Sequence, residues 1–219
     1  NRGDLGEIYF AKAHAVRRRA VPTWGVFLNE YEQGGGPLID IGTHALDLTL
    51  WMMNNYKPQS VLGQTFKKLG DQTETGNIWG DWDPKEFTVE DSAFGLIRME
   101  NGATIFLESS WALNTLDTGE AITTLCGTKA GADMRDGVRF NMVDLGCQTV
   151  KKPDLSAGGV AFFEGSAGMT PAQMEAHYWI NAILNDTDPM VLPEQALTVT
   201  EILEAIYTSA KTGKAVYFD

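Results

Sequence analysis

The dipeptide Asn101-Gly102 separates two runs, 92–100 and 103–112, in which apolar and polar side chains alternate. Asn-Gly readily adopts the positive φ angles of a tight turn between antiparallel strands, so it is the strongest short-range signal for a hairpin. Shorter β-patterned runs separated by glycine turns follow at 121–126, 132–135, 138–143 and 148–151. Strands joined by tight turns form an antiparallel meander, and this constrains the fold more than any other feature of the chain.

The remaining segments predict helices that pack against this sheet. An almost wholly apolar run from Thr43 to Met53 predicts a buried helix, and proline starts followed by polar stops predict helices over 171–185 and 193–212. We expect further strands at 7–18, 60–68 and 215–218, and long loops at 22–37, 70–88 and 153–169. The fold class predicted for 1–219 is a single α+β domain. It has an open, mostly antiparallel sheet with helices packed on one face.

Charge and composition exclude several functions. The net charge of −12 opposes binding to nucleic-acid phosphates. No apolar run approaches the roughly 18 residues of a membrane helix, so we predict no membrane partner. Cys126 and Cys147 are too few for a disulfide framework, which favours a cytoplasmic location, and no signal peptide is evident. Because the chain begins at Asn1 rather than Met, we expect it to be a fragment of a longer protein.

The sharpest group of polar residues follows the triple glycine 34–36. Asp40, His44 and Asp47 are spaced four and three apart, which places them on one face of a helix. A carboxylate that orients an imidazole is suited to proton transfer near neutral pH. In the structural alternative, Asp40 caps the helix, Asp47 is solvated and His44 is a hydrogen-bonded core residue.

The same residues with His177 also suggest a zinc site, because Asp and His at helical spacing can chelate the ion. No HExxH or CxxC motif supports this interpretation, so we predict no metal site. A metal-dependent hydrolase or isomerase is therefore a distant alternative.

The segment Gly34-Gly-Gly-x-Leu-x-Asp40-x-Gly42-x-His44-x-x-Asp47 resembles a motif of the Gfo/Idh/MocA oxidoreductases, the family of glucose–fructose oxidoreductase and inositol dehydrogenase. Further similarities extend in family order to residue 216. They comprise Val89-Glu90-Asp91, Asn101-Gly102, Glu108-Ser-Ser-Trp111, Leu125-Cys-Gly127-Thr128 and Ala205-Ile-Tyr207-x-Ser209.

The resemblance covers only the C-terminal half of that family. It implies that the dinucleotide-binding Rossmann domain, with its glycine fingerprint and the family's catalytic lysine, is absent from this chain. NAD or NADP would then be held mainly by that domain, and Gly35 and Gly36 are our candidates for contact with the cofactor. It further implies that His44 is the catalytic acid/base, with Asp40 orienting it or binding the substrate hydroxyl. Asp47 would lie next to them in the polyol site.

The expected substrate is a small carbohydrate or polyol. Substrate-binding candidates outside the motif are Trp24, Arg18, Trp111 and His177. For each of them a structural role, in a solvated loop, the sheet or a helix core, is the alternative. The family also implies a homodimer or homotetramer formed through the open sheet face, and apolar residues on both faces of the 92–112 hairpin agree with it. A non-enzymatic carbohydrate-binding or assembly module with the same fold is the alternative to the enzyme, which we expect to be inactive as an isolated domain.

Overall fold

The computed structural model describes residues 3–153 and 169–218, and the loop predicted at 153–169 lies almost wholly outside them. Its centre is a nine-stranded sheet in the order β8-β7-β6-β5-β1-β4-β3-β2-β9. All neighbouring strands are antiparallel except β1 and β4, which are parallel. The strands are β1 Ile8–Val16, β2 Pro58–Phe66, β3 Ser92–Met99, β4 Thr104–Ser110, β5 Gly119–Gly127, β6 Ala130–Asp133, β7 Arg139–Asp144, β8 Cys147–Lys151 and β9 Val216–Tyr217.

The predicted hairpin is confirmed as the pair β3–β4. Gly102 has a φ of 87°, and the Asn101 side chain accepts a hydrogen bond from the Ala103 amide at 3.1 Å. The Met99 amide donates to the Ala103 carbonyl at 2.8 Å and closes the turn. A glycine in the left-handed region at the end of a short hairpin loop preserves the strand register.

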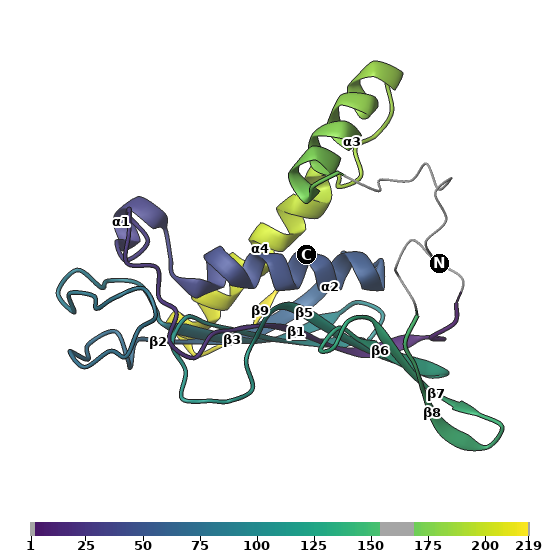
Figure 1. Ribbon diagram of the computed structural model, residues 1–219, viewed down its shortest axis with the longest axis horizontal. Coiled ribbons are helices and arrows are strands. Elements are labelled where there is room, and N and C mark those ends of the chain that lie inside the picture. The colour runs from purple at the N-terminus through teal and green to yellow at the C-terminus, as the bar shows by residue number, and fades with distance from the viewer. Residues whose placement is uncertain (1–2, 154–168, 219) are drawn as a thin grey trace.

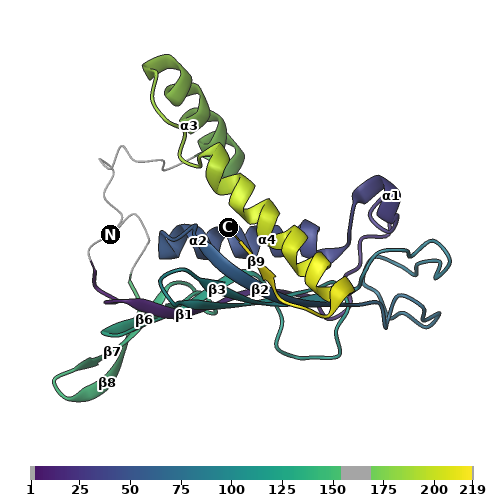
Figure 2. The same ribbon diagram turned by 180° about the vertical axis from the view of Figure 1, so that it is seen from behind.

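Two helices cover one face of the sheet, as predicted. The helical elements are α1 Glu30–Gln33, the π-helix η1 Leu38–Gly42, α2 Thr43–Met53, α3 Pro171–Asn185 and α4 Pro193–Thr212. In Figures 1 and 2, α2 and α4 lie across the same face, whereas the segment between β4 and β5 hangs from the other. The described structure is therefore an α+β fold with an open sheet.

Close packing of α4 on the sheet depends on two glycines. A Cβ atom on Gly63 of β2 or Gly95 of β3 would press into Ile206 of α4. The strands also separate the apolar residues by face: Ile97 and Ile105 are fully buried in the core, while their neighbours Leu96 and Phe106 are exposed on the open face. Alternation along a strand explains why Ile97 and Ile105 are buried while Leu96 and Phe106 are exposed, because successive side chains point to opposite faces.

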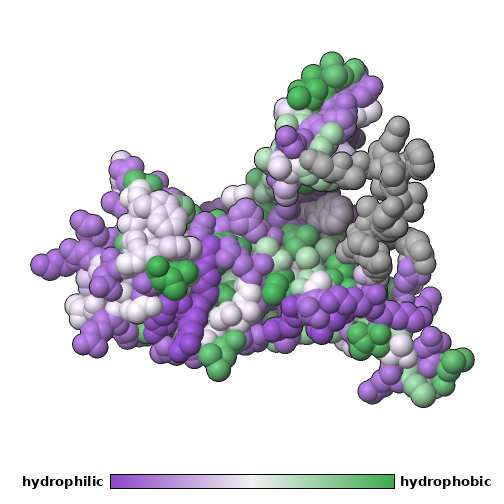
Figure 3. Space-filling view, in the orientation of Figure 1, coloured by the Kyte–Doolittle hydropathy of each residue, from purple (hydrophilic) through white to green (hydrophobic). Residues whose placement is uncertain are grey.

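Several predicted details are wrong. The strand predicted at 132–135 is β6 at Ala130–Asp133. α1 lies within the loop predicted at 22–37, and η1 occupies Leu38–Gly42, for which no element was predicted. Trp51 is 48% exposed on α2, so this helix is only partly buried. α3 projects away from the sheet instead of packing on it, and apolar surface is visible at its free end in Figure 3. Within 3–153 and 169–218, no helix is long and apolar enough to cross a bilayer.

Candidate functional site

The segment that carries Asp40 and His44 begins with a π-helical turn. In η1 the amide of Thr43 donates to the carbonyl of Leu38, five residues earlier, and the chain then continues as α2. The Ser109 hydroxyl donates to the Pro37 carbonyl at 2.7 Å and ties the start of this turn to β4. Isolated π turns occur frequently at functional sites because they re-aim the side chains that they carry.

Asp40 is fixed by a buried tryptophan. The Trp111 indole N–H donates to Asp40 Oδ2 at 2.8 Å, and the Trp111 ring is fully buried against the ring of Phe27. A fully buried ring offers no open face to a sugar. Our prediction that Trp111 contacts substrate is therefore replaced by a role in holding Asp40.

His44 lies at the surface, on the first turn of α2, so it is not the core histidine of the structural alternative. Asp47, one turn further along α2, is partly buried. Burial raises the pKa of its carboxyl, and the nearby His44 partly offsets that rise. The charge of Asp47 in turn adds to burial in raising the pKa of Tyr56 to about 12. The Tyr56 hydroxyl is buried and has no hydrogen-bond partner among the described residues, and our sequence reasoning did not single it out.

A second carboxylate, that of Glu90, binds the backbone of the glycine segment. Glu90 accepts hydrogen bonds from the amides of Gly36 at 2.9 Å and Leu38 at 3.1 Å, and from the Tyr207 hydroxyl at 2.8 Å. Burial raises the pKa of Glu90, and these three bonds partly offset the rise. Glu90 and Tyr207 were predicted only as parts of family motifs, without a role. We name this group the Glu90 clamp.

The clamp explains the two glycines that we predicted to contact the cofactor. Gly35 and Gly36 are buried, and a Cβ atom would overlap the Tyr207 hydroxyl at Gly35 or the Glu90 carbonyl at Gly36. Tyr207 and Glu90 of the same domain thus occupy the space that side chains at Gly35 and Gly36 would need. The cofactor assignment is corrected accordingly: these glycines allow close internal packing.

The arginine triplet at the end of β1 is mostly paired. Arg17 donates two hydrogen bonds to the carboxylate of Glu120, at 2.6 and 2.7 Å, and Arg19 donates to Asn114 at 2.7 Å. Arg18 is exposed and lines a cavity of about 430 Å³. Trp24 is 52% exposed, and its ring contacts that of Trp79.

His177 lies on the projecting helix α3, and its ring is bonded to Asn181 of the same helix at 2.8 Å. His177 is exposed, and α3 projects away from the sheet and from α2 (Figure 1). The structure therefore does not support His177 as a substrate contact or as a zinc ligand together with Asp40 and His44. Within the described residues, no three His, Cys, Asp or Glu side chains gather closely enough to hold a metal ion.

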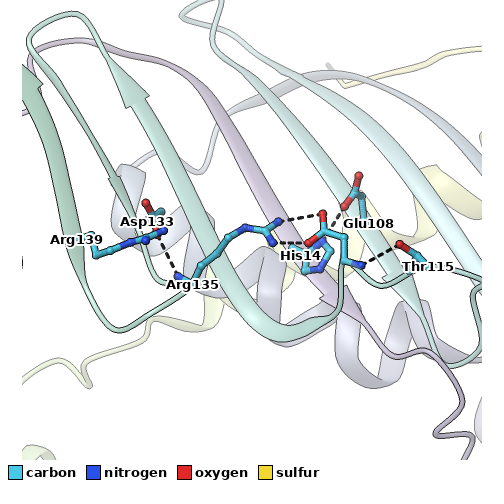
Figure 4. Close-up of polar contacts among 7 residues, drawn as sticks. His14, Glu108, Thr115, Asp133, Arg135 and Arg139 are labelled. Carbon is cyan, nitrogen blue, oxygen red and sulfur yellow. Dashed lines mark hydrogen bonds and ion pairs between the residues drawn. The ribbon is translucent and has the colours of Figure 1, made fainter. Parts of the chain in front are cut away.

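A further polar cluster, which the sequence did not reveal, lies on the open face of the sheet (Figure 4). The buried His14 is bonded through Nδ1 to Glu108 at 2.7 Å, and this bond is the main cause of the lowered pKa of Glu108. Beside them Arg135 forms an ion pair with Asp117. Because β1 alternates, His14 points away from α2, so this cluster is separate from the His44 turn.

Comparison with known proteins gives the family of this fold. Residues 1–218 match the model of the "Oxidoreductase family, C-terminal alpha/beta domain" of the Gfo/Idh/MocA group. D-glucoside 3-dehydrogenase of Escherichia coli (strain K12) is 36% identical over 214 residues. These residues cover 98% of this chain but 58% of the relative, so the chain spans less than two thirds of the relative's length.

Solved structures with lower sequence identity share the fold. An oxidoreductase domain protein from Kribbella flavida has a TM-score of 0.77 at 18% identity, covering 99% of this chain and 61% of its own. Levoglucosan dehydrogenase, in complex with NADH and L-sorbose, has a TM-score of 0.72 at 17% identity, covering 99% and 60%.

Proposed function

Because the chain belongs to the C-terminal alpha/beta domain family of Gfo/Idh/MocA oxidoreductases, we propose that it is the substrate-binding and acid/base part of an NAD(P)-dependent dehydrogenase. Its substrate is a sugar or polyol, and a D-glucoside is favoured by the relative named above. The observation that carries the proposal is the exposed His44, one turn after Asp40, whose carboxylate is oriented by Trp111.

In this proposal His44 accepts the proton of a secondary hydroxyl while the carbon that bears it becomes a ketone. A surface imidazole is suited to this step because histidine exchanges protons near neutral pH. Asp40 binds the same hydroxyl or orients the imidazole, and Trp111 keeps the carboxylate of Asp40 in place. Asp47 binds a neighbouring hydroxyl, and its raised pKa reflects its partly buried position.

NAD or NADP, when bound, supplies the hydride acceptor for such an oxidation. Gly35 and Gly36 leave no room for a dinucleotide, because they are buried under Tyr207 and Glu90. A separate dinucleotide-binding domain of the same protein therefore holds the cofactor in our proposal, and 1–219 is the single C-terminal substrate domain. Without that domain the chain does not turn over substrate. A cytoplasmic location stays a prediction.

The proposal is tested in the protein that joins this chain to its dinucleotide-binding domain. We expect oxidation of D-glucosides with NAD or NADP, followed by the absorbance of the reduced cofactor, and we expect His44→Ala to abolish it while cofactor binding is kept. His177→Ala is the matched control and retains full activity, because that ring lies on α3. Unchanged turnover in His44→Ala contradicts the assignment.

The open sheet face forms the second part of the proposal, a homodimer or homotetramer. Leu62, Leu96 and Phe106 are exposed on neighbouring strands of this face, and such a patch on a soluble domain is typical of an interface. Light scattering after size-exclusion chromatography tests it. We expect an oligomer that Phe106→Asp dissociates and that Leu145→Asp, at an exposed turn residue, leaves intact. A monomer at micromolar concentration excludes this interface.

A further inference from the structure

The tryptophans around the site are of two kinds. Trp82 and Trp111 are buried, and their indole N–H groups donate to the Gly70 carbonyl and to Asp40. Trp24 and Trp79 are 52% and 42% exposed, and neither indole N–H donates to a group in the described part of the chain. Core packing explains the first pair. Core packing does not explain why the large rings of Trp24 and Trp79 are half exposed to solvent, with indole N–H groups that donate to no described residue.

The backbone segments that carry these exposed rings are anchored to each other. The Asn77 side chain bonds both the amide and the carbonyl of Val21, at 2.8 and 3.0 Å. The Thr23 hydroxyl donates to the Trp79 carbonyl at 2.9 Å, and the Ile78 amide donates to the Arg19 carbonyl at 3.2 Å. The loop between β2 and β3, which carries Trp79, is thus fastened to the segment after β1, which carries Trp24. Groups that are fixed before a ligand arrives lose little entropy when they bind it.

Together the two indoles form a corner. Their ring centroids are 5.0 Å apart and their planes meet at 75°. The Arg17 guanidinium lies 5.3 Å from the centroid of Trp79 and is itself fixed by Glu120. We name Trp24 and Trp79 the indole corner.

The indole corner is linked to Asp40 through two packed aromatic rings. Trp24 contacts Phe27 at a centroid distance of 5.9 Å, and Phe27 contacts Trp111 at 6.2 Å. Trp111 then donates its hydrogen bond to Asp40. This series links the indole corner to the residues that we propose hold the oxidised sugar ring.

We propose that the indole corner binds the second ring of a glycoside whose oxidised sugar ring lies at His44. The inference rests on the proposed function and extends it, because it assigns a separate subsite to the part of the substrate beyond the oxidised ring. A second pyranose and an aromatic aglycone share the required chemistry, a flat apolar face that packs on an indole. The pyranose adds hydroxyl oxygens that accept from the free N–H groups.

The test compares one-ring and two-ring substrates in the protein that carries its dinucleotide-binding domain. Methyl β-D-glucoside fills only the first position, whereas cellobiose and phenyl β-D-glucoside also present a second ring. We expect Trp24→Ala and Trp79→Ala to lower kcat/KM for the two-ring substrates about tenfold, mainly through KM, since a stacked aromatic contact and its buried area contribute on that scale. The kcat/KM for methyl β-D-glucoside stays within about twofold.

Two further variants keep the test decisive if an alanine variant folds poorly. Trp24→Phe and Trp79→Phe retain an aromatic face and are expected to recover most of the two-ring preference. Trp51→Ala is the matched control, because Trp51 is 48% exposed but lies at the far end of α2. It leaves the ratio of two-ring to one-ring kcat/KM unchanged.

The outcomes separate this inference from the proposed function. A loss confined to cellobiose assigns the corner to a second sugar, and a loss confined to phenyl β-D-glucoside assigns it to an aromatic aglycone. Equal losses for one-ring and two-ring substrates, or no loss, overturn the subsite while the dehydrogenase assignment stands. Absence of turnover with every substrate overturns both.

Discussion

Replacing Tyr207 by phenylalanine removes one hydroxyl from the Glu90 clamp and leaves the ring. That hydroxyl donates to Glu90 at 2.8 Å, and Glu90 keeps its two backbone donors at Gly36 and Leu38. A hydrogen bond to a charged, buried acceptor contributes about 1.5–3 kcal/mol. For a domain of this size, the loss corresponds to a fall in Tm of about 3–12 °C.

The effect also depends on pH, with a definite sign. Burial raises the pKa of Glu90 in the folded state above its ordinary value of 4.5. Because the unfolded state then ionises more readily, the free energy of unfolding falls as pH rises from about 4.5 through the folded-state pKa. The Tyr207 bond favours the charged form, so its loss raises the pKa further. The variant is therefore most destabilised above that pKa and approaches the parent protein in acid.

Urea unfolding of the purified chain at several pH values measures both quantities. Tyr31→Phe is the matched control, because Tyr31 is 93% exposed on α1 and donates no side-chain hydrogen bond in the described structure. A destabilisation of Tyr207→Phe that is the same at acid and neutral pH, or no larger than that of the control, refutes the assigned role of the clamp.

Three other substitutions test further contacts of the structure. Trp111→Phe removes the donor to Asp40 and is expected to cost about 1–3 kcal/mol in urea unfolding, with a matching loss of turnover in the full protein. Gly36→Ala drives a methyl group into the Glu90 carbonyl and is expected to destabilise the chain by at least about 1–3 kcal/mol, measured by thermal unfolding. His14→Phe removes the bond that lowers the pKa of Glu108, so carboxyl NMR titration should show that pKa rising. In the parent chain the contribution of this bond to the free energy of unfolding is lost as pH falls below about 4.5 through the folded-state pKa. The free energy of unfolding of the variant should therefore fall less over this pH range.

Local signals predicted the elements whose ends are set by their own residues. Pro171 and Gly213 stand at the first position of α3 and at the C-terminal cap of α4, where their backbone preferences place them. Asn101-Gly102 likewise determines the β3–β4 turn. Such features need no knowledge of the rest of the chain, because the side chain or φ angle of one residue decides them.

Arrangements that depend on distant segments were not predictable in this way. β1 lies between β4 and β5 and runs parallel to β4, although these strands are far apart in the chain. The proline start and polar stop of α3 predicted a helix at 171–185, which we expected to pack on the sheet, but such end signals do not say what a helix packs against. Periodicity states which face is apolar and leaves its partner unspecified.

The candidate site shows the same limit on a smaller scale. The order Asp40, His44, Asp47 was evident from spacing, but the groups that fix it come from three other places: Trp111 after β4, Glu90 before β3 and Tyr207 on α4. Each was visible as part of a motif, and none had a role until the fold brought it to the glycine segment. The triple glycine is then best understood as the place where α4 and the hairpin approach the turn most closely. In our proposal this turn carries the acid and the base, so α4 helps to hold the segment on which both depend.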